Sequence, residues 1–268
     1  MGSTQVVSRL KYLLHPSKIG HAGTLDPLAT GVLPIALGKA TRLIPFVMDD
    51  KKTYEFTIQW GRETDSDDLA GKVIASSDIR PKKQEILSVL PQFLGQIMQT
   101  PSIFSAIKIN GQRAYDLARS GQKVSMKSRP VQIHNLQLIR SNNERADFVA
   151  TVSKGTYIRT LAHDIAHALN TVGVVVRLNR IHDGPFDISQ SISLDDDLTG
   201  HILPMKSVLG NLPQLGIDFD MAKRIRCGQR IKDVSFVHLD GVYAVMHESE
   251  IVAIAEIKRG ILHPKSVF

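Results

Sequence analysis

The chain has 268 residues, 43% of them hydrophobic, and a formal net charge of +7. This length supports a substantial core in one or two domains, and the basic balance favours a polyanionic partner such as nucleic acid. The single cysteine, Cys227, excludes an intrachain disulfide. The sequence shows neither a membrane-spanning apolar run nor a signal-peptide pattern, so we expect a cytoplasmic enzyme or nucleic-acid-binding protein.

Hydrophobic periodicity predicts the elements of the first three-quarters of the chain. Apolar residues on one face predict an amphipathic helix over 4–14. Alternating Tyr54, Phe56, Ile58 and Trp60 predict a strand over 53–60. The further predicted elements are a polar loop at 61–71, a helix at 81–94, strands at 131–140 and 146–154, a helix at 156–170 and a buried strand at 172–181.

The pattern changes near residue 200, where Gly200, Pro204, Gly210 and Pro213 indicate a linker. A short helix at 220–227 and three short strands, starting near 241, 251 and 261, are predicted after it. Before the linker, strands and helices alternate without a regular βαβ rhythm. We therefore predict an α+β fold with a mixed, largely antiparallel sheet, plus a small C-terminal β-rich domain.

A glycine- and proline-rich loop over 18–34 contains two central titratable residues, His21 and Asp26. One interpretation is purely structural, with Asp26 capping a short helix that Gly31 terminates. The other is that a stiff turn presents Asp26 as a nucleophile or base. The two interpretations are compatible, because a capping carboxylate can also face a cleft. His21, taken alone, reads as an ordinary hydrogen-bonding residue.

His163 and His167 lie four residues apart on the predicted helix, which is a zinc-like spacing. The glutamate of the HExxH pattern is absent, so a solvated helix face is the favoured interpretation. No cysteine cluster or phosphate-binding loop is present in the sequence. We therefore predict no metal site and no cofactor.

Two further segments are basic. Residues 108–129 carry Lys108, Arg113, Lys123, Lys127 and Arg129, and form either a solvated loop or a phosphate-gripping insert. Arg159 falls in the first turn of a helix, where the dipole disfavours a cation. It is either a surface residue or the partner of an anionic group.

Together these segments resemble the TruB family of tRNA pseudouridine synthases. The stretch 20–31 resembles the family's catalytic motif, and 51–54 resembles its tyrosine motif. The stretches 101–106 and 111–115 resemble the next block, and 153–159 resembles the arginine motif. Residues 178–180 resemble the leucine-containing block, although the family often has Arg where this chain has Asn179.

The resemblance implies isomerisation of uridine to pseudouridine in the TΨC loop of tRNA, at conventional position 55, without metal or cofactor. Asp26 would be the catalytic carboxylate, Tyr54 would stack on the flipped base, and Arg159 would pair with Asp26. His21 would place the nucleotide and Leu178 would line the pocket. The basic insert at about 102–130 would grip the stem-loop.

The resemblance also implies a synthase domain over 1–203, a PUA-like RNA-binding domain over 204–268, and a monomer. The family has a strand and a Lys-Pro segment before the first helix. Because this chain begins at Met1 within that region, we expect a truncated N-terminus or an internal start. Two alternatives stay open: a non-catalytic tRNA-binding or tRNA-folding protein on the same scaffold, and a metal-dependent hydrolase that uses His163 and His167.

Overall fold

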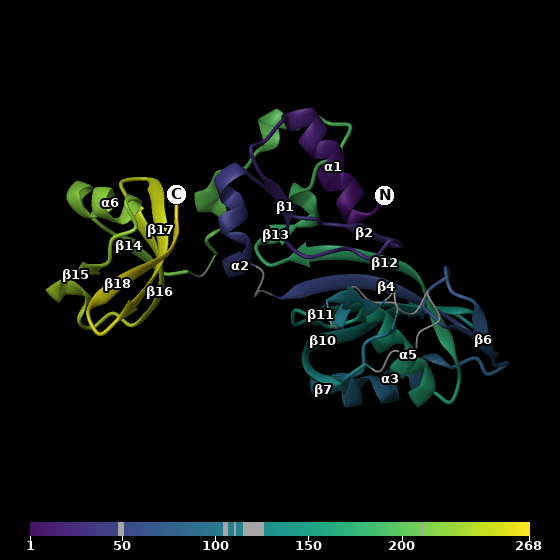
Figure 1. Cartoon of the computed structure of the whole chain (residues 1–268). Helices are drawn as coiled ribbons and strands as arrows, with labels where there is room; N and C mark the ends of the chain where they lie inside the picture. Colours follow the sequence, from purple (N-terminus) through teal and green to yellow (C-terminus); the bar gives the residue numbers. More distant parts are fainter. Residues whose placement is uncertain (48–50, 104–106, 110, 115–125, 211) are drawn as a thin grey trace. The chain divides into compact units, whose positions relative to one another are not determined.

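The computed structural model describes residues 1–47, 51–103, 107–109, 111–114, 126–210 and 212–268 (Figure 1). The chain forms two compact units, each assembled from separate stretches of sequence. Unit 1 comprises Met1–Gly2, Leu25–Leu33 and Asp49–Ser191, and unit 2 comprises Ser3–Thr24, Pro34–Met48 and Ile192–Phe268. In the part of the chain that is described, every helix is too short or too polar to cross a membrane.

Unit 1 is built on a seven-stranded sheet with the order β13-β12-β4-β11-β10-β7, in which β2 also pairs with β12. The β2–β12 pairing is parallel, and the other pairings in this sheet are antiparallel. The predicted α+β fold with a largely antiparallel sheet is confirmed. The strands are β2 (Ala29–Gly31), β4 (Lys52–Trp60), β7 (Gly95–Gln99), β10 (Arg129–Ser141), β11 (Arg145–Val152), β12 (Gly173–Asp183) and β13 (Phe186–Asp187).

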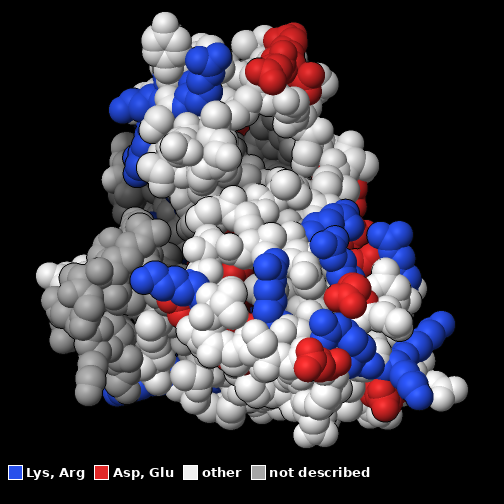
Figure 2. All heavy atoms as spheres, turned by 90° about the vertical axis from the view of Figure 1, so that its right-hand side faces the viewer, with Lys and Arg blue, Asp and Glu red and all other residues white. Residues whose placement is uncertain are grey.

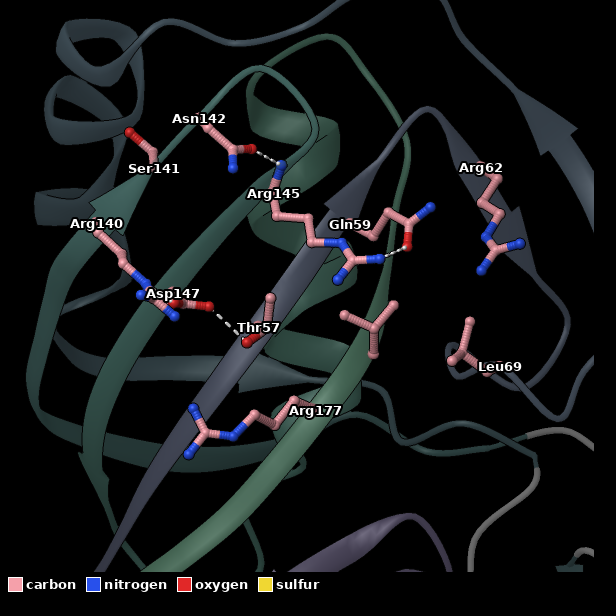
Figure 3. Close-up of a pocket in the computed structure, with 11 residues that line it drawn as sticks. Thr57, Gln59, Arg62, Leu69, Arg140, Ser141, Asn142, Arg145, Asp147 and Arg177 are labelled. Carbon is pink, nitrogen blue, oxygen red and sulfur yellow. Dashed lines mark hydrogen bonds and ion pairs between the residues drawn. The ribbon is translucent and has the colours of Figure 1, made fainter.

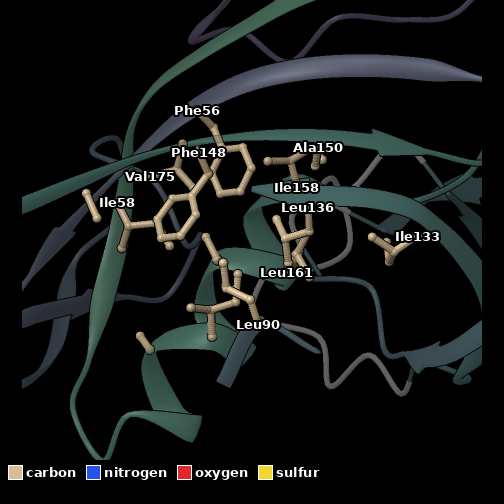
Figure 4. Close-up of a cluster of buried hydrophobic side chains, with 14 of the residues drawn as sticks. Phe56, Ile58, Leu90, Ile133, Leu136, Phe148, Ala150, Ile158, Leu161 and Val175 are labelled. Carbon is tan, nitrogen blue, oxygen red and sulfur yellow. The ribbon is translucent and has the colours of Figure 1, made fainter. Parts of the chain in front are cut away.

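Alternation along the central strands gives this sheet one apolar face. Phe56 of β4 lies opposite Phe148 of β11 on one side and Leu178 of β12 on the other. The rings of Phe56 and Phe148 stack with centroids 5.2 Å apart (Figure 4). Helices α5 (Ile158–Ala168) and α3 (Lys83–Val89) contribute buried side chains to the same core. Each fully buried side chain of this size contributes about 1.5–3 kcal/mol.

Shorter elements complete unit 1, and one of them lies in a stretch that was predicted to be a loop. The stretch 61–71, predicted as a loop, contains β5 (Arg62–Thr64), which pairs with β6 (Val73–Ser76). The prediction of a short helix capped by Asp26 is wrong, because residues 27–28 form a turn that leads directly into β2. The remaining elements are η2 (Leu90–Phe93), β8 (Lys108–Ile109), β9 (Gln112–Arg113) and η3 (Ile188–Gln190).

Unit 2 contains the predicted β-rich piece as a five-stranded sheet with the order β14-β16-β17-β18-β15. One side of this sheet packs on α6 (Phe219–Arg226), the predicted short helix, through Ala222 and Ile225. The strands are β14 (Gln214–Gly216), β15 (Ile231–Lys232), β16 (Gly241–His247), β17 (Glu250–Lys258) and β18 (Ile261–Val267).

The N-terminal stretches of unit 2 include the predicted first helix, α1, and a two-stranded sheet of β1 and β3. Leu43 and Phe46, from 34–48, pack in a second apolar cluster with Leu209, Met246 and Ile254. The other elements are α1 (Ser3–Leu14), β1 (Ile19–His21), β3 (Ile35–Leu37), η1 (Gly38–Arg42), α2 (Ile44–Val47), η4 (Thr199–His201), η5 (Met205–Val208) and η6 (Val234–Phe236).

Candidate active site

The expected partnership of Asp26 and Arg159 is present in unit 1. Arg159 is the second residue of α5 and its side chain is only 4% exposed. Its Nε atom donates to Asp26 Oδ2 at 2.8 Å. The Asp26 side chain is 34% exposed, so the pair joins a buried cation to a carboxylate that solvent can reach. That arrangement orients an anionic oxygen while leaving one side of it accessible.

Arg159 is held by a second set of contacts that the sequence analysis did not identify. Its Nη1 atom donates to the Ser66 carbonyl oxygen at 2.7 Å and lies 3.3 Å from Asp68 Oδ2. Asp68 is fixed in turn, because its Oδ1 accepts from the Ser66 hydroxyl and the Ala70 amide. The helix dipole disfavours a cation at this end of α5, and the two carboxylates offset that cost. The only sequence signal for these contacts is that Asp68 and two other aspartates fall in the stretch 61–71, which is predicted to be a polar loop.

Strand β2 fixes the turn that carries Asp26. The Ala29 amide donates to the Asp26 carbonyl oxygen at 2.9 Å, which closes the turn. Ala29 then lies opposite Leu178 in the parallel pairing with β12, and the Val32 amide donates to the Arg180 carbonyl oxygen at 2.9 Å. Asp26 is therefore positioned by a strand pair rather than by a helix cap.

Tyr54 lies opposite Arg180 in the β4–β12 pairing and packs against the apolar core of unit 1. Burial raises the pKa of the Tyr54 phenol above its usual value, while the neighbouring Arg180 guanidinium opposes the shift. The phenol is therefore neutral at physiological pH and can donate a hydrogen bond. The Asp26 carboxylate also raises the pKa of this phenol, so the two side chains are close enough to interact electrostatically.

A buried ionic network lies behind Tyr54. Asp183 is 3% exposed, with its Oδ2 3.2 Å from Arg180 Nη1, and its Oδ1 also accepts from Lys52 Nζ. Arg180 additionally donates from Nε to the Val32 carbonyl oxygen at 2.8 Å. Leu178 is 4% exposed and belongs to the same core as Tyr54. The ionic network and the apolar core together fix the end of β12 that pairs with β2, and β2 directly follows the turn that carries Asp26.

The other predicted site residues lie on elements apart from those that hold the Asp26–Arg159 pair, or outside the described residues. His21 lies on β1 in unit 2, whereas Asp26 belongs to unit 1. Lys108 and Arg113 pair through their backbones in the β8–β9 hairpin, and Lys123 lies outside the described residues. Their proposed contacts with RNA stay predictions.

The last two basic residues of the insert, Lys127 and Arg129, differ in environment. Lys127 is exposed. Arg129 instead donates from Nη2 to the Gly155 carbonyl oxygen at 3.1 Å, and its guanidinium lies 4.9 Å from the ring centroid of Tyr157. Arg129 therefore supports the segment that leads into α5 and Arg159.

A cavity of about 640 Å³ lies on the other face of the unit 1 sheet (Figure 3). Its floor includes Thr57 and Gln59, which alternate along β4 with the core residues Phe56 and Ile58. The lining includes one acid, Asp147, and four arginines, Arg62, Arg140, Arg145 and Arg177. Because Tyr54 shares the parity of Phe56, this cavity is separate from the Asp26–Arg159 pair.

Two of these arginines already have acidic partners. Arg140 donates to Asp147, and Arg177 Nη2 lies 3.2 Å from Glu55 Oε2. On the face of the molecule drawn in Figure 2, Lys and Arg side chains likewise stand in separate groups with acidic side chains among them. The net charge of +7 is thus not gathered into one continuous basic surface on the part of that face that the structure describes.

Among the described residues, a set of side chains with metal-ligand atoms close together comprises Glu63, His163 and His167. The two histidines are those of the zinc-like spacing on α5. Glu63 comes from β5, far away in the sequence. This set does not include Asp26, Tyr54 or Arg159.

Comparison with known proteins identifies the family to which this chain is similar. Residues 11–158 match the TruB family pseudouridylate synthase (N terminal domain). The chain is 43% identical over 284 residues to tRNA pseudouridine synthase B of Bradyrhizobium diazoefficiens, covering 100% of this chain and 82% of that protein. It is 44% identical over 270 residues to tRNA pseudouridine synthase B of Zymomonas mobilis, covering 96% and 88% respectively.

Solved structures agree on the fold. A chain of a Cbf5-Nop10-Gar1 complex superposes with a TM-score of 0.76 at 24% identity, covering 100% of this chain and 81% of that one. A chain of an H/ACA RNP bound to a substrate RNA containing 2'-deoxyuridine superposes with a TM-score of 0.74 at 22% identity, covering 100% and 81%. At these identities the likeness concerns the fold alone.

Proposed function

Because this chain belongs to the TruB family of pseudouridylate synthases, we propose that the uridine it isomerises to pseudouridine lies in the TΨC loop of tRNA, at conventional position 55. In this reaction the N-glycosidic bond breaks, the base turns, and a bond to carbon forms. The carbon that gains the sugar loses its proton, and the released nitrogen gains one. No atom is added or lost overall.

The observation that carries the proposal is the ion pair between a solvent-accessible carboxylate and a buried guanidinium. The Asp26–Arg159 contact of 2.8 Å supports a role for Asp26 as the catalytic carboxylate. A base within folded RNA must leave its stack to reach such a group. The carboxylate then attacks the sugar, attacks the base or removes a proton, and each of these roles requires an oriented, accessible oxygen.

Tyr54 and Arg159 have supporting roles in this proposal. The ring of Tyr54 stacks on the flipped base, and its neutral hydroxyl is available to move a proton. Arg159 orients Asp26 and balances its charge. Leu178 forms the apolar wall beneath the base, and His21 helps place the nucleotide.

The remaining parts of the proposal concern the partner and the domains. The TΨC stem-loop is held by the basic insert, through Lys108, Arg113, Lys123, Lys127 and Arg129. The synthase domain spans 1–203, and 204–268 is a PUA-like RNA-binding domain. The chain acts as a monomer in the cytoplasm.

An unmodified tRNA transcript tests the proposal directly. After incubation with the chain, pseudouridine is mapped at single-nucleotide resolution, and the expected result is one modified uridine at position 55. Modification at a different uridine contradicts the proposed site. The absence of pseudouridine from every substrate tRNA favours a non-catalytic tRNA-binding or tRNA-folding protein.

Asp26→Asn separates catalysis from binding. The variant is expected to form no detectable pseudouridine while its affinity for tRNA stays within about threefold of the parent, because an amide preserves shape and removes only the anionic oxygen. Asp78→Asn is the matched control, since Asp78 is an exposed carboxylate in the same unit. Substantial turnover by Asp26→Asn rejects the assignment of the catalytic residue.

A further inference from the structure

Glu63, His163 and His167 converge on one point at the outer side of α5. His163 and His167 stand one helical turn apart, and their rings stack with centroids 4.1 Å apart. Each directs its Nε2 atom at the Glu63 carboxylate, His163 at 3.4 Å from Oε1 and His167 at 3.0 Å from Oε2. One ligand atom from each residue lies within 4.8 Å of the other two.

The two histidine–glutamate separations are near those of ligands that share a small metal ion. Nitrogen and oxygen ligands lie about 2.0–2.2 Å from Zn²⁺ in tetrahedral sites, so two of them lie roughly 3.3–3.6 Å apart. The two histidine–glutamate distances, 3.4 and 3.0 Å, are close to this value. Binding of an ion between them requires the partly exposed histidine rings to rotate.

A second observation concerns the other nitrogen of His163. Its Nδ1 atom lies 3.2 Å from Asp164 Oδ1. Histidines that bind a metal through one ring nitrogen commonly donate the other N–H to a carboxylate, which fixes the tautomer and the ring orientation. His163 is thus already oriented by the kind of partner that a metal ligand has.

We propose that Glu63, His163 and His167 bind a divalent transition-metal ion of the Zn²⁺ class, with water completing the coordination. Two imidazoles and one carboxylate suit Zn²⁺, Co²⁺ or Ni²⁺, whereas Mg²⁺ and Ca²⁺ prefer oxygen ligands alone. The site is open to solvent, because the side chains of His163 and His167 are 31% and 49% exposed. Glu63 is 12% exposed and forms the floor.

The bound ion cross-links β5 to α5. The segment after β5 supplies the Ser66 carbonyl oxygen and the Asp68 carboxylate that hold Arg159. The ion therefore stabilises the segment that positions Arg159, without touching Asp26. The metal site is separate from the proposed isomerisation, which needs no metal chemistry, so either can fail without the other.

Binding of Zn²⁺ to the full-length, tag-free chain tests the site. After treatment with chelator and removal of the chelator, titration calorimetry is expected to show one saturable Zn²⁺ site that tenfold excess Mg²⁺ does not block. Glu63→Gln and His167→Ala are each expected to weaken binding about tenfold or more. His134→Ala is the matched control, because His134 is an exposed histidine on β10. The affinity of this variant for Zn²⁺ should equal that of the parent.

Two further measurements keep the result interpretable. Co²⁺ gives a visible absorption band typical of low coordination number when it binds at this site, and the band is lost in His167→Ala. Zn²⁺ raises the thermal midpoint of the parent chain but not that of Glu63→Gln, because a ligand that binds only the folded state stabilises it. Circular dichroism confirms that each variant is folded.

Three results overturn the proposal: no saturable Zn²⁺ binding by the parent, equal loss in His134→Ala and His167→Ala, or undiminished binding by the Glu63→Gln, His167→Ala double variant. In each case the three side chains form only a hydrogen-bonded group on the surface. None of these measurements uses pseudouridine formation as its readout, so the test of the metal site does not depend on the proposed function.

Discussion

Arg159 combines three contacts that a different cation cannot reproduce. Its Nε atom donates to the Asp26 carboxylate, while Nη1 donates to the Ser66 carbonyl oxygen and the Asp68 carboxylate. A guanidinium can do this because its donors are fixed in a planar fork, whereas a lysine ammonium is a single point charge on a flexible stem. The geometry of this one side chain therefore decides how Asp26 is presented.

Arg159→Lys is expected to lower the rate of pseudouridine formation by about 10- to 100-fold, because one charge-assisted hydrogen bond contributes roughly 1.5–3 kcal/mol. The affinity for tRNA should change little, since Arg159 is buried. Single-turnover kinetics with saturating enzyme measure the rate, and filter binding measures the affinity.

Lys83→Arg is a suitable control for an exchange between lysine and arginine, since Lys83 is exposed on α3 in the same unit. It should leave the single-turnover rate of the parent unchanged. An Arg159→Lys variant that turns over at the parental rate contradicts the positioning role. A variant that loses tRNA affinity in proportion to rate indicates that Arg159 contacts the RNA instead.

Part of this site could be predicted from the sequence because it lies in compact motifs. Asp26, Tyr54 and Arg159 each lie in a short stretch that resembles a motif of the family. Asp68 and Glu63 could not be predicted, because they meet α5 only through long-range folding of a stretch that read as a polar loop. The histidine spacing was visible, but the carboxylate that joins it comes from β5 rather than from the helix itself.

At the level of elements, Gly31 determines how closely β2 approaches β12. Its φ of +99° lies in a region that L-residues rarely adopt. A Cβ atom at this position would stand 2.2 Å from the Arg180 carbonyl oxygen, which belongs to the backbone and cannot rotate away. The turn that carries Asp26 depends on this contact.

Gly31→Ala is therefore expected to destabilise the protein by more than the roughly 1–3 kcal/mol that left-handed strain alone costs, and to reduce pseudouridine formation by displacing Asp26. Gly95→Ala is the matched control. Gly95 has a φ of +85°, but an added Cβ meets nothing within 4 Å. Urea unfolding of both variants separates strain from steric clash, and equal losses of stability contradict the role given to β2.

Long periodic elements were predictable, and short ones were not. Strand β4 and helix α5 have repeats of two and about 3.6 residues, and they were expected within a few positions of their observed ends. Strands β2 and β5 have three residues each, too few to show a period. They exist because β12 and β6 provide hydrogen-bonding partners. In β2, that long-range pairing overrides the capping preference of Asp26.

At the level of the whole molecule, unit 2 is not a simple C-terminal appendage. Its apolar cluster joins Leu43 and Phe46 to Leu209, Met246 and Ile254, which lie some 160 residues or more further along the chain. Leu43 is 2% exposed. The apolar partners of Leu43 and Phe46 therefore come from the predicted linker and from the strands that follow it.

A fragment ending at residue 203 should consequently expose Leu43 and Phe46, since most of their apolar partners are deleted. Losing the burial of Leu43 costs about 1.5–3 kcal/mol in unfolding free energy, and the half-buried Phe46 adds a smaller loss. The exposed surface promotes association. We expect the fragment to unfold at a lower temperature than the full chain and to self-associate in size-exclusion chromatography. Replacing both residues with serine within the fragment should reduce the association, because it removes the apolar surface without restoring the missing strands. A monodisperse fragment with the parental thermal midpoint would show instead that 34–48 does not depend on the C-terminal cluster.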